Sequence, residues 1–408
     1  MRRTALTLPA TAAVGLLLTA CAGGGGGEAP SEIDESSFEG LELTMWHGVP
    51  YDPFMTVNAE QLSACADEIG ATITAEALPS DQFLPSVLQA ASSGDLPDIL
   101  MGSSANLSQY AEGGLLADLS TYGITTDGLA EATAEMGYYE GTLVGVASHV
   151  EVGALEYNPD LFEAAGVEPP TTFDELREVA AELTTDDVYG IALPGISADG
   201  SGDFFLMNFI LGAGGDPSDP ADPGTIAAIQ LYKDLVEDGS MSAEMVNWGW
   251  DFQDPFNAGT AAMTVNGPWA TSPSEGQAPR AFALTPTDGD NEPASAVIGF
   301  EWVIPVSDDE TAMAAAAEII KCRLSVENQL EIAQVQAYIP ANTEAAEQWA
   351  AETPAVAPFV ELVPNAYSHG TIFGEEWGGI STMLGNAIQY AVVGGMSAEE
   401  ALQQAASE

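Results

Sequence analysis

The stretch Tyr157–Leu183 reads YNPDLFEAAGVEPPTTFDELREVAAEL and contains the signals for a sharp turn followed by a helix. Pro169 and Pro170 end one element because proline lacks the backbone N–H donor that a continuing helix needs. Thr172 can cap the N-terminus of the next helix, and Glu175 lies at the spacing of a capping box. The stretch therefore predicts a break between two elements and a helix that opens after Thr172.

Working outward, strands and helices alternate on the N-terminal side of this stretch. The pattern predicts, in order, a strand at Leu41–Gly48, a helix through Asn58–Ile69, a strand at Ala71–Leu78, a helix from Asp81, and a short buried strand ending at Leu100. Alternation up to about Asn158 is typical of an α/β domain with a mostly parallel sheet. On the C-terminal side, 161–284 is predicted to be rich in helix with short strands such as Ala261–Val265, and three more helical segments follow Pro305.

The N-terminus has the pattern of a secretory signal peptide. Arg2 and Arg3 precede an uncharged run, 6–18, that is shorter than the roughly 20 residues of a membrane span. Leu18–Cys21 (LTAC) resembles the bacterial lipobox, whose cysteine is lipidated and becomes the new N-terminus; an ordinary signal peptide with Cys21 incidental is the alternative. We therefore expect a lipoprotein signal peptide at 1–20, a flexible Gly-rich tether at 21–40, and a chain anchored by lipid to the extracellular face of the cell membrane.

Acidic residues dominate the charge of the chain. Removal of 1–20 leaves 388 residues with 62 acidic and five basic side chains, a net charge of −57. Such a field repels nucleic acid and anionic membrane surfaces, so neither is expected as a partner. A cationic ligand is conceivable, but acids spread along the whole chain favour an adaptation to salt, which screens their mutual repulsion.

Signatures of catalysis or of a bound cofactor are missing from the sequence. It contains no G-x-S-x-G, no P-loop and no H-E-x-x-H, and its three cysteines lack the spacing of a zinc site. Pairs of acidic residues suited to glycoside cleavage carry no information here, because a chain with 62 acids contains many such pairs. We therefore expect no enzyme, no cofactor and no metal, and keep a secreted carbohydrate-active enzyme and a cell-surface adhesion or sensor protein as the rival classes.

Four stretches in the right order resemble the extracellular solute-binding proteins of ABC importers, family 1, in the branch of maltose- and oligosaccharide-binding lipoproteins. These are SGDLPDIL with YAEGGLLADLS, the opening stretch YNPDLF…PPTTFDEL, FNAGTAAMTVNGPWA, and GFEWVIPVSDDETAMAAAAEII with QAYIPANTEA. The resemblance spans about 41–407. It implies an α/β, two-lobed, periplasmic-binding-protein-like fold (type II) with a ligand cleft between lobes joined by hinge strands, a permease partner and a monomeric chain.

The resemblance also implies where the lobes divide, because the family's chain crosses between its lobes more than once. We expect lobe 1 at 41–147 plus 299–345 and lobe 2 at 148–298 plus 346–408. Such lobes close on their ligand by a hinge motion.

The ligand site is expected to combine aromatic rings with acids and amides, as sugar binding requires. Glu151 lies where the maltose-binding relative has a sugar-contacting glutamate, and Trp269 matches the stacking tryptophan of that relative. Trp46 and His47 end the first strand, where α/β sheets place ligand contacts. The predicted ligand-binding residues are Trp46, His47, His149, Glu151, Trp248, Trp250, Trp269, Glu301, Trp302, Glu376 and Trp377.

Departures from the relative limit the expected ligand. Its charged residues after the first strand are replaced by Pro50-Tyr51-Asp52, and those after the Pro-Asp strand by Gly102-Ser103-Ser104. The resemblance therefore favours a neutral sugar or oligosaccharide over sugar acids and phosphates. A non-sugar solute, in particular a cation, is the alternative within this class.

Cys65 and Cys322 are the cysteines left beside Cys21, and they face an oxidising exterior. Cys65 falls in the first helix of lobe 1, and Cys322 in a helix that the family returns to lobe 1. A disulfide between them and a pair of buried free thiols remain equally open.

Overall fold

The computed structural model describes residues 38–195, 201–272 and 275–408. A seven-stranded sheet forms the centre of what we call the first lobe. Its order is β12-β6-β11-β3-β1-β2, with β13 paired to β11. Its strands are β1 (Glu42–His47), β2 (Thr72–Ala77), β3 (Ile99–Ser103), β6 (Val146–Val152), β11 (Ser295–Val303), β12 (Ile339–Pro340) and β13 (Ala366–Tyr367).

Strands β1, β2 and β3 are parallel, whereas β11 runs antiparallel to both β3 and β6. Leu43 and Met45 alternate with exposed residues along β1 and turn into the core, where Ile99 of β3 and Ile319 of α10 meet them. The predicted first strand is confirmed, but the strand expected to end at Leu100 continues to Ser103.

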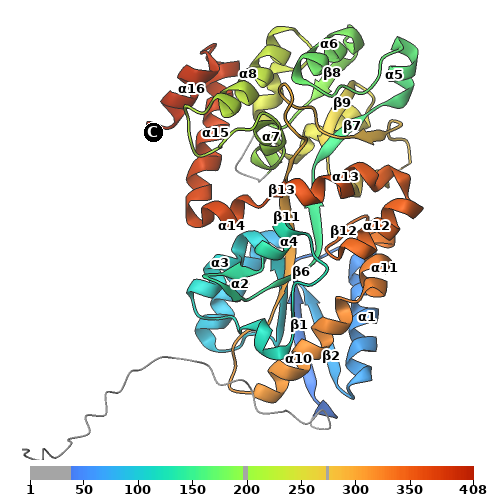
Figure 1. Cartoon of the computed structure of the whole chain (residues 1–408), viewed down its shortest axis with the longest axis vertical. Coiled ribbons are helices and arrows are strands. Elements are labelled where there is room, and N and C mark those ends of the chain that lie inside the picture. Colours follow the sequence, from blue (N-terminus) through green and yellow to red (C-terminus); the bar gives the residue numbers. More distant parts are fainter. Residues whose placement is uncertain (1–37, 196–200, 273–274) are drawn as a thin grey trace, which may run out of the picture. The chain divides into compact units, whose positions relative to one another are not determined.

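Helices cover the first sheet, and Figure 1 shows α1 and α10 beside its strands. The helices and short strands of this part are α1 (Phe54–Glu68), α2 (Ser80–Ser93), α3 (Leu107–Glu112), α4 (Glu131–Glu135), β4 (Tyr138–Tyr139), β5 (Thr142–Leu143), α10 (Glu310–Arg323) and α11 (Val326–Gln336). Cys65 of α1 and Cys322 of α10 are joined as a disulfide with Cα atoms 5.7 Å apart. The bond ties two helices of one lobe that lie 257 residues apart in the sequence.

A four-stranded sheet, ordered β10-β7-β9-β8, forms the centre of the second lobe. Its strands are β7 (Ala154–Tyr157), β8 (Tyr189–Ala192), β9 (Ala261–Asn266) and β10 (Ala281–Ala283). Around it lie α5 (Pro159–Ala165), α6 (Phe173–Leu183), α7 (Ser201–Gly212), α8 (Pro223–Glu237), α9 (Asp254–Asn257), α15 (Trp377–Val392) and α16 (Ala398–Ala405). In Figure 1 the C-terminal pair α15 and α16 lies beside α8, and the three helices share one apolar core.

The opening stretch of the sequence folds as its turn signals predict. Asn158 caps α5 and Thr172 caps α6, where the Thr172 Oγ1 accepts from the Glu175 N–H at 3.2 Å. The capping box is incomplete, because the Glu175 carboxylate accepts from the N–H of Thr171, at 2.8 Å, rather than from that of Thr172. The turn is therefore closed one residue earlier than the sequence spacing predicts.

Two strands carry the chain from one lobe to the other, and a set of buried polar groups clamps them to α7. The Asn208 Nδ2 of α7 donates to the carbonyl of Gly153, which links β6 to β7, at 3.1 Å. The Asn208 Oδ1 accepts from the Ala296 N–H at 3.1 Å, and the Ser295 Oγ accepts from the Gly153 N–H at 2.9 Å. A Cβ on Gly153 would lie 2.5 Å from the Asn208 amide, so only glycine fits this clamp.

The expected lobe boundaries fall inside the crossing strands. Residues 147/148 lie in β6 and 298/299 in β11, both of which belong to the first sheet. The segment 346–365, expected in lobe 2, contacts both sheets. Helices α12 (Thr343–Glu352) and α13 (Ala357–Leu362) bury Trp349 and Phe359 in one cluster with β6, and the Phe359 ring also lies 5.0 Å from the Phe282 ring of β10. Only the later helices α15 and α16 join the second core, and α14 (His369–Phe373) precedes them. Seven α-helices, not three, follow Pro305.

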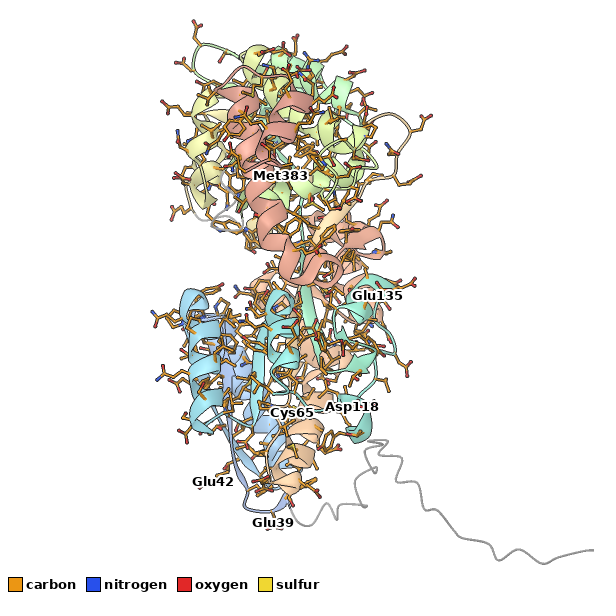
Figure 2. All side chains as sticks on the ribbon, turned by 90° about the vertical axis from the view of Figure 1, so that its left-hand side faces the viewer. Glu39, Glu42, Cys65, Asp118, Glu135 and Met383 are labelled. Atoms are coloured by element: carbon orange, nitrogen blue, oxygen red, sulfur yellow. A yellow bond between two sulfur atoms is a disulfide. The ribbon has the colours of Figure 1, made fainter. Side chains whose placement is uncertain are left out.

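Acidic side chains project outward from the ribbon, as the labelled Glu39, Glu42 and Glu135 do in Figure 2. Within the described ranges, no helix is both long enough and apolar enough to cross a lipid bilayer. The predicted signal peptide, Cys21 and residues 21–37 of the predicted tether lie outside the described residues. The last residues expected in the tether belong to the first lobe, because Phe38 is buried in its core and the Gly40 N–H donates to the carbonyl of Gly70 at 2.8 Å.

Candidate functional site

A cavity of about 430 Å³ lies where the crossing strands meet the loops of the second lobe. Five of its seven lining side chains are aromatic and one is a carboxylate. The lining residues are Tyr51, Glu151, Trp250, Trp269, Phe300, Gln336 and Tyr338. Aromatic faces with a few polar groups are the usual lining of a small-molecule site.

The first lobe supplies one wall of the cavity from segments at strand ends and on the crossing strands. Tyr51 follows the carboxyl end of β1, the edge at which α/β sheets place ligands. Glu151 and Phe300 come from β6 and β11, and Gln336 and Tyr338 come from the end of α11 and the residue before β12. Four separate segments thus converge on one space.

The second lobe supplies two indole rings that meet edge to face. Trp250 opens a 3₁₀ turn, Trp250–Gln253, and Trp269 lies in another, Pro268–Thr271. Their ring centroids are 6.0 Å apart with planes at 64°, and 45% of Trp250 is exposed. A Cβ on Gly267 would lie 2.0 Å from the Trp269 ring, so the indole lies directly against the glycine backbone.

Behind the first wall, the His149 ring packs parallel to two lining residues. Its centroid is 4.6 Å from Phe300 and 4.5 Å from Tyr338, with interplanar angles of 16° and 4°. Burial, aided by the charge of Arg323, lowers the pKa of His149 to about 3, so the ring is neutral at pH 7. His149 therefore supports the wall and does not line the cavity.

Glu151 is the one acid that lines the cavity. Burial raises the pKa of its carboxyl to about 7. Burial, with Glu151 next in effect, also raises the pKa of the Tyr338 hydroxyl far above its ordinary value. Since none of the described residues lining this space is a Lys or Arg, the cavity offers hydrogen-bond acceptors, hydroxyls and ring faces but no cation.

Three of the predicted ligand-binding residues come together here, namely Glu151, Trp250 and Trp269. Trp46 does not: it packs on the core around Phe83 and Leu100. His47 is 2% exposed and meets Phe54 edge-on, and burial lowers its pKa to about 4. Neither of these two predicted residues at the end of β1 lines the cavity, and the next loop supplies Tyr51 instead.

The other acid–aromatic pairs also lie away from the cavity. Trp302 is fully buried under the Arg323 guanidinium, 5.2 Å from it, and Glu301 beside it is 2% exposed. Trp248 packs on the core around Phe256. Trp377 at the start of α15 packs on His369 with the ring planes at 34°, and Glu376 before it is exposed to solvent. These five residues do not line the cavity, because they are packed in the core or lie at a helix end.

Four lining residues were not among the predicted ones: Tyr51, Phe300, Gln336 and Tyr338. Phe300 directly precedes the predicted pair Glu301 and Trp302, and a register shift between Phe300 and Glu301 breaks the simple alternation of the strand. Gln336 and Tyr338 lie in the stretch QAYIPANTEA, whose resemblance to the family was a usable signal.

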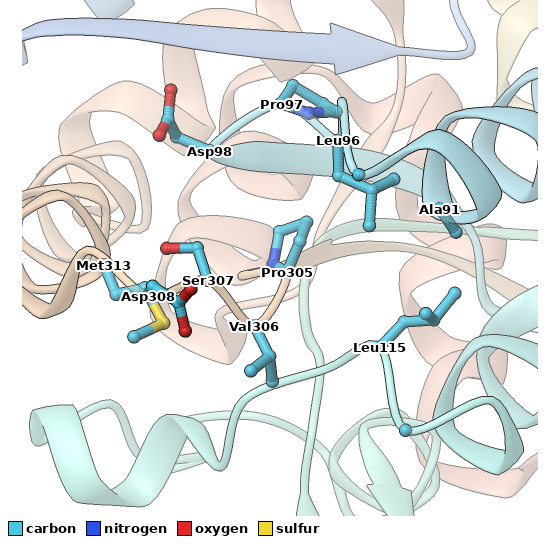
Figure 3. Close-up of a pocket in the computed structure, with 12 residues that line it drawn as sticks. Ala91, Leu96, Pro97, Asp98, Leu115, Pro305, Val306, Ser307, Asp308 and Met313 are labelled. Carbon is cyan, nitrogen blue, oxygen red and sulfur yellow. The ribbon is translucent and has the colours of Figure 1, made fainter.

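A second cavity, of about 390 Å³, lies at the other ends of the first-lobe strands. Figure 3 shows Asp98, Ser307, Asp308, Pro305 and Leu115 among the residues that line it. The Asp98 carboxylate already accepts from the N–H and hydroxyl of Thr44 at 2.7 and 3.0 Å. The cavity has no aromatic ring and lies before β3 begins, so it lacks both the lining and the location of a ligand site in an α/β sheet.

The fold therefore places an aromatic cavity between two α/β lobes. Among the described residues, no cluster of three or more His, Cys, Asp or Glu side chains could hold a metal ion. The sequence profile of the bacterial extracellular solute-binding proteins matches residues 60–358, and the chain belongs to this family. Proteins of this family bind solutes and are not enzymes.

Individual relatives agree with this assignment. A Brucella abortus (strain 2308) protein described as a binding protein is 23% identical over 356 residues, which are 84% of this chain and 86% of that protein. The maltotriose-binding protein of Pyrococcus abyssi is 27% identical over 246 residues, 56% of this chain and 50% of that protein. The cyclic alpha-maltosyl-1,6-maltose binding protein from Arthrobacter globiformis has the same fold, with a TM-score of 0.77 and 24% identity over 90% of this chain and 97% of that chain.

Proposed function

We propose that the protein captures a neutral sugar or oligosaccharide in the aromatic cavity. The observation that carries the proposal is the pairing of Trp250 and Trp269 from one lobe with Glu151 and Tyr338 from the other. A pyranose has apolar C–H faces and a rim of hydroxyls. Ring faces would cover the former, and the carboxylate and tyrosine hydroxyls would bond to the latter. Two relatives described as binding maltosaccharides support the same ligand class.

The expected energetics are those of stacking plus a charged hydrogen bond. Covering an indole face removes apolar area from water at roughly 25 cal/mol per Å². A hydrogen bond to a carboxylate contributes on the order of 1.5–3 kcal/mol. Loss of either group should therefore be measurable as weaker binding.

The test is calorimetric titration of the mature chain with mono-, di- and trisaccharides, maltose and maltotriose included. Trp269→Ala should weaken binding by about one to two decades, since it removes one stacking face. Glu151→Gln should cost less than Glu151→Ala, because an amide keeps one acceptor oxygen. Tyr189→Ala, which removes an exposed aromatic ring outside the cavity, is the matched control. Normal binding by Trp269→Ala together with a much lower melting temperature would make Trp269 a core residue and sink the proposal.

A cationic solute is the second candidate, because five aromatic rings and one carboxylate with no basic neighbour also suit a quaternary or primary ammonium. Affinity for such a cation should rise with pH as Glu151, whose pKa burial raises to about 7, loses its proton. Glu151→Gln should then abolish this pH dependence and most of the binding. A neutral sugar should show no strong salt dependence and a weaker pH dependence than the cation, because the protonated carboxyl of Glu151 can still bond to a sugar hydroxyl.

We further propose that the loaded protein delivers its solute to the permease of an ABC importer and is held at the membrane by a lipid on Cys21. The family assignment and the LTAC sequence support this part of the proposal. Cys21→Ala should release the protein from membrane fractions or stall its processing, and mass analysis of the wild-type N-terminus should find acyl chains. Unchanged membrane retention of the variant would exclude the anchor.

A further inference from the structure

We propose that a buried polar cluster positions both tryptophans of the second lobe, and this proposal rests on the function proposed above. The cluster consists of Glu156, Gln253, Asn266 and Arg280, which we call the Asn266 cluster. These are positioning residues, since none of them lines the cavity. The observation behind the proposal is that their bonds end on the two turns that carry Trp250 and Trp269.

Asn266, the last residue of β9, connects the two turns. Its side chain is buried, and the Nδ2 donates to the Glu156 Oε2 at 2.8 Å and to the Gln253 Oε1 at 3.1 Å. Gln253 ends the turn that Trp250 opens. The Asn266 Oδ1 accepts from the N–H of Gly267 at 2.9 Å, directly before the turn that holds Trp269. One amide thus fixes the end of one turn and the start of the other.

Arg280 holds the far side of the Trp269 turn. Its Nη1 lies 2.9 Å from the Glu156 Oε1 in an ion pair and donates to the carbonyl of Ala270 at 3.4 Å. The Nη2 donates to the Asn257 Oδ1 at 2.9 Å, and the guanidinium lies over the Phe256 ring. The Trp269 turn is therefore fixed on both sides of the indole.

Stability alone is a weak reason for such a cluster. The Glu156–Arg280 pair is 0% and 6% exposed, whereas each other ion pair in the described chain has a partner exposed by more than a third. Buried ion pairs can often be replaced by apolar residues without loss of stability, because desolvation offsets the attraction. Fixing the geometry of two turns is a task that apolar packing performs less well.

The positioning also explains the role of Gly267. With no side chain there, the Trp269 indole can lie on the backbone that Asn266 holds. Trp250 meets this ring at 64°, so the two indoles form a corner rather than a flat stack. Two indoles at 6.0 Å and 64° are close enough for their interaction to be followed by spectroscopy.

Circular dichroism in the far ultraviolet tests the inference, because two closely packed indoles give an exciton couplet there. Trp250→Phe and Trp269→Phe should each remove the couplet and so assign it. Gln253→Met keeps the shape of the side chain but breaks its bond to Asn266, and should reduce the couplet at least twofold. Gln253→Glu, which keeps an acceptor oxygen, should restore most of it. Gln230→Ala, a half-buried glutamine of α8 bonded to Asp234, is the matched control and should leave it unchanged.

An unchanged couplet in Gln253→Met would overturn the inference and show that contact with Phe205 and Phe252 is enough to hold the rings. If that variant does not fold, Arg280→Lys asks the same question, because it keeps the charge beside Glu156 but cannot reach Ala270 and Asn257 together. The couplet needs no ligand, so a failed search for a sugar leaves this test intact. With maltotriose as the probe, Gln253→Met should bind about threefold to tenfold more weakly, the cost of ordering a loosened turn.

Discussion

At the scale of single residues, the burial of Glu301 makes the stability of the protein depend on pH. Glu301 lies on β11 with 2% exposure, and neither carboxylate oxygen has a hydrogen-bond partner in the described structure. Gly145 and Gly299 pack against it, and a Cβ on either would lie within 3.1 Å of a carboxylate oxygen. Burial raises the pKa of Glu301 to about 8, so the folded protein holds it protonated at pH 7.

This group makes the free energy of unfolding depend on pH with a definite sign. The pKa of Glu301 is higher in the folded than in the unfolded chain. Its contribution to the free energy of unfolding is therefore fully present below the ordinary pKa of 4.5 and is lost as pH rises toward 8. Glu301→Gln should remove this loss. The variant should gain on the wild type by on the order of 1 kcal/mol per pH unit between pH 5 and 8, with no further gain above.

Urea unfolding at several pH values measures this gain, and Glu135→Gln on α4 is the control, since Glu135 is exposed. Parallel pH profiles for wild type and Glu301→Gln would show that the carboxyl has a partner or solvent access in solution.

Residue by residue, Trp269 and Glu151 were predicted from their match to the maltose-binding relative, and Trp250 was predicted without a matched motif. All three line the cavity. Trp302 and Phe300 lie two residues apart, yet one is core and the other lines the cavity. Sequence pattern cannot separate them, because the difference depends on Arg323 and Tyr338, which come from distant helices and strands.

At the scale of elements, local signals were sufficient for the parallel strands and for the cap at Thr172. They did not show that α12 and α13, expected in lobe 2, contact both sheets. Trp349 and Phe359 share a buried cluster with β6 and Ile339, and Phe359 also meets Phe282 of β10. Such long-range packing leaves no mark in local periodicity. The sequence alone could not predict which distant segments pack against each other.

The link between α1 and α10 leads to a second prediction about stability. The Cys65–Cys322 disulfide closes a loop with a sequence separation of 257 residues. Replacing both cysteines by alanine should lower the free energy of unfolding by on the order of 4–5 kcal/mol, chiefly by freeing the unfolded chain.

Calorimetric melting checks the effect, with reduced wild type as the comparison, and peptide mapping without reductant checks the bond. Equal melting of oxidised and reduced protein would mean that the thiols are free. Because both helices belong to the first lobe, ligand affinity should change little.

At the scale of the whole molecule, charge is the dominant feature. Of the five basic residues beyond the predicted signal peptide, Arg177, Lys233, Arg280 and Lys321 form ion pairs, and Arg323 is buried among Asn58, Gln61 and Trp302. Most of the 62 acids therefore have no basic partner to offset them.

Screening should stabilise such a molecule, because folding brings like charges closer together. The melting temperature should rise from low ionic strength into the molar range, with sodium chloride as well as with sodium sulfate. Sulfate also stabilises proteins because it is excluded from their surface, an effect separate from screening. The chloride series is therefore the decisive test of screening. A flat response to chloride would contradict the predicted adaptation to salt.

The clamp of Gly153, Asn208 and Ser295 determines where the two lobes can pivot. Both crossing strands are fastened to α7 on the side of the second lobe, so bending has to take place beyond the clamp, within 146–152 and 297–303. The register shift at Phe300/Glu301 lies within the second of these segments, and we expect it to take part in the bending. Amide protons of Gly153 and Ala296 should consequently exchange with deuterium equally slowly with and without ligand, while those beside the bulge report the motion.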